Sequence, residues 1–199
     1  MVAQLRPGNP NDIPVAKFEI ENEEVFHLKN LYKRIYEWLN DEGFVSVDVG
    51  DDKIERFYLD RTLLDGNKEH QIWWRSVMEP QNNKYYRYFL KINYQTLYMK
   101  KIEIMHKGQK FGTNKGDVIL RVESWLQMDY DDETKNWDNN SFLRLFKRWF
   151  DRRLYKEKID WYKKDLYRLT YRLHTAIKQY LQLKMTDDWG RPFHPEKGV

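Results

Sequence analysis

The sequence predicts an α+β fold with an N-terminal helix, an antiparallel meander of four to five strands and two C-terminal amphipathic helices. Three observations support this fold class. Apolar residues recur with a helical period over residues 23–41. They alternate with polar residues through most of residues 44–130, and they return to the helical period after residue 140.

The composition is that of one aromatic-rich domain. The 199 residues are 41% apolar and include 8 Trp, 14 Tyr and 10 Phe, which is enough to build a core. Proline and glycine concentrate at both ends of the chain. We therefore expect a flexible arm at residues 1–17, a single α+β domain at 18–184 and an irregular tail at 185–199.

The sequence favours a cytoplasmic protein. Cysteine is absent, which excludes disulfides, thiolate metal sites and cysteine nucleophiles and is compatible with a reducing compartment. Residues 1–15 hold no apolar run of signal-peptide length, and no segment approaches 18 consecutive apolar residues. We expect no transmembrane segment, although a basic surface could still contact a membrane peripherally.

The first helix is predicted over residues 23–41, after a short strand at 18–21. Asn22 is placed to cap the helix, and Gly43 is placed to end it. The apolar positions at helical spacing are Val25, Leu28, Tyr32, Ile35 and Leu39, widened by Leu31 and Trp38.

Shorter strands are predicted next from alternation with a period of two. Apolar runs at residues 44–49, 54–63 and 70–78 are separated by turn residues, and Asp65 with Gly66 forms a good hairpin turn. The runs are consecutive and joined by short turns. This pattern favours antiparallel pairing of neighbours along the chain.

The longest strand signal places apolar residues at even positions through residues 86–104. Such a run exceeds the usual strand length, so we expect a bend or bulge near residues 98–101, where polar residues invade the even face. A second even-numbered apolar row follows at residues 118–130. Together these runs predict a sheet whose buried face is rich in Tyr and Trp.

The two C-terminal helices form a predicted basic hairpin at residues 140–184. Residues 135–184 contain 14 Lys or Arg against 5 Asp or Glu, whereas residues 1–134 contain 19 against 23. Ser141 or Asn140 can cap the first helix. Clustered charge of one sign is costly without a counter-charge, so this segment suggests an anionic partner.

Candidate binding residues recur every four positions on each of these helices, beside one aromatic residue. They are Arg144, Arg148, Arg152, Trp161, Lys164, Arg168 and Arg172. Lys and Arg neutralise phosphates and an exposed ring stacks on a base, which favours RNA or a ribonucleoprotein as partner. The alternatives are an acidic protein, the chain's own acidic sheet, or a solvated helix surface whose charge is offset by Asp151, Asp160 and Asp165.

The residues predict no catalytic centre, cofactor or metal site. The five histidines form no ligand doublet, and the acidic run at residues 129–133 lacks the alternation and glycine of a calcium loop. The glycine-rich segment at 108–116 departs from the phosphate-binding loop because Thr113 follows Gly112, and it is predicted to be a hairpin loop. We therefore favour a non-enzymatic binding or assembly protein. Formation of a homo-oligomer is compatible with this function.

The aromatic sheet suggests an alternative function. A curved sheet covered by a helix can enclose a cavity. The protein would then be a carrier of a small apolar or aromatic ligand, or an enzyme whose active site is this cavity. More often such rings simply fill the core. The rings in question are Trp74, Tyr86, Tyr88, Tyr94, Tyr98 and Trp125.

Overall fold

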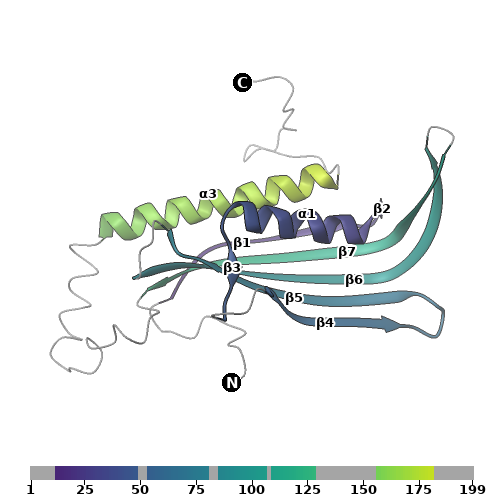
Figure 1. Cartoon of the computed structure of the whole chain (residues 1–199), viewed down its shortest axis with the longest axis horizontal. Coiled ribbons are helices and arrows are strands. Elements are labelled where there is room, and N and C mark those ends of the chain that lie inside the picture. The colour runs from purple at the N-terminus through teal and green to yellow at the C-terminus, as the bar shows by residue number, and fades with distance from the viewer. Residues whose placement is uncertain (1–11, 49–52, 81–84, 107–108, 129–155, 182–199) are drawn as a thin grey trace.

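A curved antiparallel sheet forms most of the described part of the molecule (Figure 1). The computed structural model describes residues 12–48, 53–80, 85–106, 109–128 and 156–181. In chain order the elements are β1 (Ile13–Asn22), β2 (Val25–Phe26), α1 (Leu28–Asp41), β3 (Val45–Ser46), β4 (Glu55–Thr62), β5 (Lys68–Met78), β6 (Tyr86–His106), β7 (Gln109–Met128) and α3 (Lys156–Tyr180).

The seven described strands pair in the order β1-β7-β6-β5-β3. The short strand β2 pairs with β7, and β4 pairs with β5 beside β3. The strands β4, β5, β6 and β7 each pair antiparallel with their neighbour along the chain, which confirms the predicted antiparallel sheet but not its predicted size of four to five strands. The N-terminal strand β1 closes the other side of the sheet against β7.

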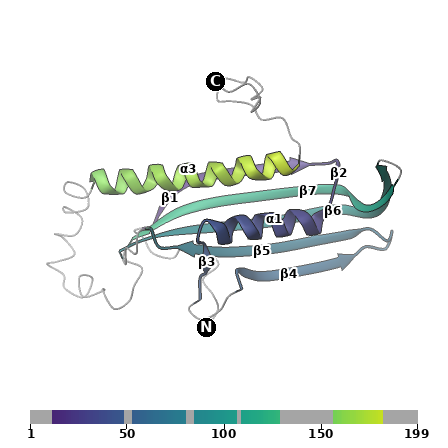
Figure 2. The same ribbon diagram turned by 45° about the horizontal axis from the view of Figure 1, so that its top comes forward.

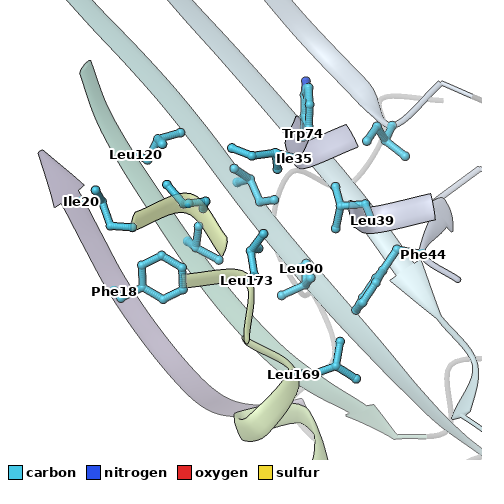
Figure 3. Close-up of a cluster of buried hydrophobic side chains, with 14 of the residues drawn as sticks. Phe18, Ile20, Ile35, Leu39, Phe44, Trp74, Leu90, Leu120, Leu169 and Leu173 are labelled. Atoms are coloured by element: carbon cyan, nitrogen blue, oxygen red, sulfur yellow. The ribbon is translucent and has the colours of Figure 1, made fainter. Parts of the chain in front are cut away.

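Both described helices lie on the same face of the sheet (Figures 1 and 2). Even-numbered residues of β1, β5, β6 and β7 point toward the helices, because alternate side chains of a strand share a face. The helices contribute Leu31, Ile35 and Leu39 from α1 and Leu166 and Leu173 from α3, all 1% exposed or less. Figure 3 shows this apolar layer between the sheet and the helices.

The opposite face of the sheet carries polar side chains that pair between neighbouring strands. Lys91 on β6 lies 2.9 Å from Glu123 on β7, and Arg121 on β7 lies 2.6 Å from Glu19 on β1. Arg75 on β5 is only 4% exposed, and burial lowers its pKa to about 10, so it stays charged at neutral pH. Such cross-strand pairs favour one register over its neighbours.

The predicted fold class is wrong in its arrangement of elements. The chain begins with a sheet strand and not with a helix, and the described part has seven strands and two helices. Only α3 is a described C-terminal helix, since the predicted helix that starts near residue 141 lies outside the described residues. The ten-residue strand β1 was underestimated because Pro14 suggests irregular structure, yet proline is tolerated in an edge strand.

The first helix begins later than predicted. Helix α1 starts at Leu28, and its cap is His27, whose Nδ1 accepts a hydrogen bond from the Asn30 amide at 3.3 Å. Val25 and Phe26, which fit the helical pattern, instead form β2 against β7. The prediction failed here because pairing with a strand about ninety residues away overrides local helix preference.

The predicted bend in the longest strand is confirmed. The register of β6 against β7 shifts between Leu97 and Lys100, and Tyr98 has a positive φ of 53°. Opposite this bulge, a Cβ at Gly116 would lie 2.8 Å from the Leu97 carbonyl oxygen and 2.9 Å from the Met99 Cα. Only glycine fits at position 116 without moving the backbone of β6. Beyond the bulge, β6 and β7 extend past the helices and curl toward the side of the sheet on which the helices lie (Figure 1).

We expect Gly116→Ala to destabilise the protein by about 2–3 kcal/mol, because the added methyl group meets backbone atoms that cannot rotate away. Urea denaturation measures this change. Gly112→Ala is the matched control on the same strand, since its Cβ would have no neighbour within 4 Å. Equal stability of the two variants would contradict this account of the bulge.

Two buried tyrosines on β6 should respond differently to loss of the hydroxyl. Tyr88 donates to Asp165 of α3 at 2.8 Å, whereas the Tyr94 hydroxyl has no hydrogen-bond partner among the described residues. We expect Tyr88→Phe to cost about 1–2 kcal/mol and Tyr94→Phe to be neutral or stabilising. Thermal unfolding of the two variants tests this. A larger loss for Tyr94→Phe would contradict it.

Candidate functional site

The solvent-facing side of α3 gathers the described candidate binding residues. The buried stripe of α3 packs on the sheet, and helical geometry leaves a second stripe pointing away from it. This second stripe, the outer face of α3, consists of Trp161, Lys164, Tyr167, Arg168, Tyr171 and Arg172. Trp161, Tyr167 and Tyr171 are 49%, 46% and 37% exposed, which is unusual for large rings.

A shallow groove of about 630 Å³ lies along this face. It is lined by Trp38 of α1 and by Tyr167, Arg168, Tyr171, Arg172, Thr175, Ala176 and Gln179 of α3. The rings of Tyr167 and Tyr171 are tilted against each other, with centroids 4.5 Å apart. The groove therefore combines flat aromatic surface with two guanidinium groups.

Lys164 and Arg168 are the exposed cations of this face. No carboxylate of the described residues forms an ion pair with either. Asp165, which could have offset them, accepts a hydrogen bond from Tyr88, and Asp160 lies 3.8 Å from Lys163. Asp160 and Asp165, which were expected to offset these two cations, thus interact with other residues. Lys164 and Arg168 can therefore bind an anion.

Arg172 has a structural partner. Its Nη1 and Nη2 atoms donate to the two carboxylate oxygens of Glu42 at 3.2 and 2.5 Å. Glu42 is the C-cap of α1, so this bidentate pair holds the end of α1 against α3. Arg172 lines the groove, but much of its charge is already balanced.

The other stripe of the sequence prediction is not placed. Arg144, Arg148 and Arg152 lie outside the described residues, so their relation to the outer face of α3 stays a prediction.

The sequence prediction missed Trp38, Tyr167 and Tyr171. A signal for the tyrosines was present, because each directly precedes an arginine at a spacing of four, on the side opposite the apolar stripe. Trp38 was assigned to the apolar face of the first helix. It is half-buried at the edge of that face and borders the groove.

Four of the six aromatic residues proposed to line a cavity, Trp74, Tyr86, Tyr88 and Tyr94, pack against other rings. Trp74 lies with its ring centroid 4.6 Å from that of Tyr32 and 4.9 Å from that of Tyr94, and Tyr86 lies 4.5 Å from Tyr162. Tyr98 is 57% exposed at the bulge. Trp125 is on the opposite, odd-numbered face of β7. The six rings therefore do not converge on one space.

The glycine-rich segment is not a phosphate cradle. Residues 109–116 belong to β7, with Gly112 paired to Glu103 and Thr113 paired to Ile102, so the backbone is engaged in a strand ladder. Among the described residues, no group of three His, Asp or Glu side chains could hold a metal ion. The acidic run at 129–133 lies outside those residues.

No protein-family model matches this chain, and no curated protein shows significant similarity to it. Neither α1 nor α3 has the length and apolar character needed to cross a lipid bilayer.

Two histidines are held in surroundings that disfavour their charged form. His70 is 8% exposed, with Nδ1 2.8 Å from the Thr96 hydroxyl, and burial lowers its pKa despite the nearby carboxylate of Asp60. His174 of α3 packs edge-on against Phe18, with centroids 4.8 Å apart. Burial, together with the charge of Lys178, lowers the pKa of His174 as well.

These two histidines predict a loss of stability in mild acid. Below the ordinary histidine pKa of about 6.5 the unfolded chain binds protons that the native chain resists, so the free energy of unfolding falls as pH decreases through that value. Denaturation at pH 7.5 and 5.5 measures the decline. The double variant His70→Gln and His174→Phe should lose most of it, and an unchanged decline would contradict this origin.

Proposed function

We propose that this chain is a non-enzymatic binding protein that contacts single-stranded RNA through the outer face of α3. The observation that carries the proposal is the combination, along one helix face, of exposed rings and of two cations that form no ion pair with a described carboxylate. Lys164 and Arg168 would neutralise phosphates, and Trp161 and Tyr167 offer flat surfaces on which bases stack. Stacking tolerates any base, so sequence-independent binding is expected.

The exposed aromatic residues support a partner over a merely solvated surface. Charged residues alone keep a helix surface soluble, whereas exposed rings gain nothing from water. Each stacked base contributes about 1–3 kcal/mol, so two or three rings are enough for moderate affinity. The alternative of a ligand cavity between sheet and helices is weaker, because the rings that would line it touch each other.

Fluorescence anisotropy with a labelled single-stranded RNA of mixed sequence tests the proposal. Replacing Lys164 and Arg168 together by Gln should weaken binding at low salt and reduce the slope of log affinity against log salt by about 1.4, since two phosphate contacts are lost. Both side chains are exposed, so thermal stability should not change.

The aromatic contribution has a separate signature. Trp161→Ala with Tyr167→Ala should weaken binding without changing the salt slope, because no charge is removed. Lys101→Gln with Lys110→Gln is the matched control, since both are exposed cations on the distant β6–β7 hairpin. A flat wild-type titration at low salt, or an equal loss in the control, would contradict the proposal. Binding to polyglutamate instead of RNA would favour an acidic protein partner.

A further inference from the structure

We infer that β4 pairs with β4 of a second copy of this chain, so that two sheets join edge to edge in a two-fold dimer. The inference does not depend on the proposed RNA contact, because it concerns the edge of the sheet at β4, and α3 lies near the other edge, at β1. It rests on an open edge, on the direction of its backbone groups and on the residues that self-pairing would bring together.

Strand β4 is an outer strand of the sheet, with no described element beyond it (Figure 2). It is eight residues long and contains no proline. Tyr58 and Leu59 are 52% and 40% exposed, and Asp60, Arg61 and Thr62 are exposed as well. A long edge strand with exposed apolar residues is a ready template for another strand.

The backbone of β4 presents alternate hydrogen-bonding groups outward. The Leu63 amide donates to the Asn67 carbonyl at 2.8 Å, which places a hydrogen-bonded pair at the turn between β4 and β5. In an antiparallel ladder such pairs alternate, so Arg61, Leu59 and Phe57 direct their backbone groups toward β5. Tyr58, Asp60 and Thr62 then direct theirs away from the sheet.

The other edge of the sheet is protected in ways that β4 is not. Strand β1 contains Pro14 and a register shift between Pro14 and Ala16. Its solvent face carries Lys17, Glu19 and Glu21, and α3 packs against its inner face at Phe18. Proline, irregularity and charge are the features by which proteins prevent unwanted strand pairing. The regular part of β4, Phe57 to Thr62, has neither proline nor a register shift, and its two charged residues, Asp60 and Arg61, are of opposite sign. This edge is therefore less protected against pairing than β1.

Charge selects the register of the pairing. A two-fold axis perpendicular to the sheet keeps each residue on its own face, so the axis passes through one residue of β4. An axis through Asp60 would place two carboxylates opposite each other, and an axis through Arg61 would place two guanidinium groups opposite each other. An axis through Tyr58 would extend the ladder into the irregularity between Glu55 and Phe57.

An axis through Leu59 avoids all three problems. It brings Leu59 against Leu59 of the second copy, on the face away from the helices. On the same face, Phe57 meets Arg61 of the second copy, whose side chain is 61% exposed and can lie on the ring. On the helix face, Tyr58 meets Asp60 of the second copy, so a hydroxyl donor faces a carboxylate. The regular residues Phe57 to Arg61 are thus complementary to themselves.

Native mass spectrometry and sedimentation of the full chain test the dimer. Over about a hundredfold range of concentration, wild type should populate a species of twice the 24.6 kDa chain mass. Leu59→Lys and Leu59→Glu should each be monomeric, because the axis places two like charges in contact. Mixing the two variants should restore a dimer containing one copy of each, which also shows that both are folded.

Val25→Lys is the matched control, since Val25 is 43% exposed on β2, at the other side of the sheet, and this variant should remain dimeric. A wild type that stays monomeric at every concentration would overturn the inference. So would dimers that persist in both Leu59 variants, a mixture without the heterodimer, or an open series of larger species, which would indicate pairing of unlike edges.

Discussion

The pairing of β6 with β7 determines the rest of the structure. These two strands form the centre of the sheet, and every other strand is attached to one of them or to β5 beside them. Their even-numbered residues form the surface on which both helices pack. The ladder tolerates one interruption, the bulge at Tyr98, because Gly116 lets the two backbones approach closely. Past the bulge, β6 and β7 extend beyond the helices (Figure 1).

The two described helices cover the same face of the sheet, and the two faces carry different residues. The helices bury one face, and Tyr88 and Tyr180 fasten α3 to the sheet and to the start of α1 through hydrogen bonds to Asp165 and to the His27 carbonyl. The other face carries ion pairs between neighbouring strands, beside buried apolar residues such as Phe89 and Val77. The apolar stripe of α3 packs on the sheet. The outer face of α3 does not take part in this packing, and it carries the exposed rings and cations.

Sequence reasoning succeeded where the signal was local. The alternating rows of β6 and β7, the bulge near Tyr98 and the stripe around Lys164 and Arg168 were all readable from spacing. It failed for β1 and β2, whose partner strand β7 lies about a hundred residues away. It also could not identify Glu42 of the same chain as a partner of Arg172. Contacts between distant segments leave no periodic trace.

By itself, the sequence determined the alternating rows of the antiparallel sheet, the amphipathic stripe of α3 and the lack of thiol chemistry, since each follows from residue type and spacing. Only the tertiary structure decided that Trp74 and Tyr94 of the sheet pack ring against ring in the core and that Tyr167 and Tyr171 border a groove. It also decided that, among the described strands, β1 and β2 form one edge of the sheet and β3 and β4 form the other. The physical reason is that the burial of a side chain and the pairing of a strand depend on other segments, which folding brings close in space although they lie far apart in the sequence.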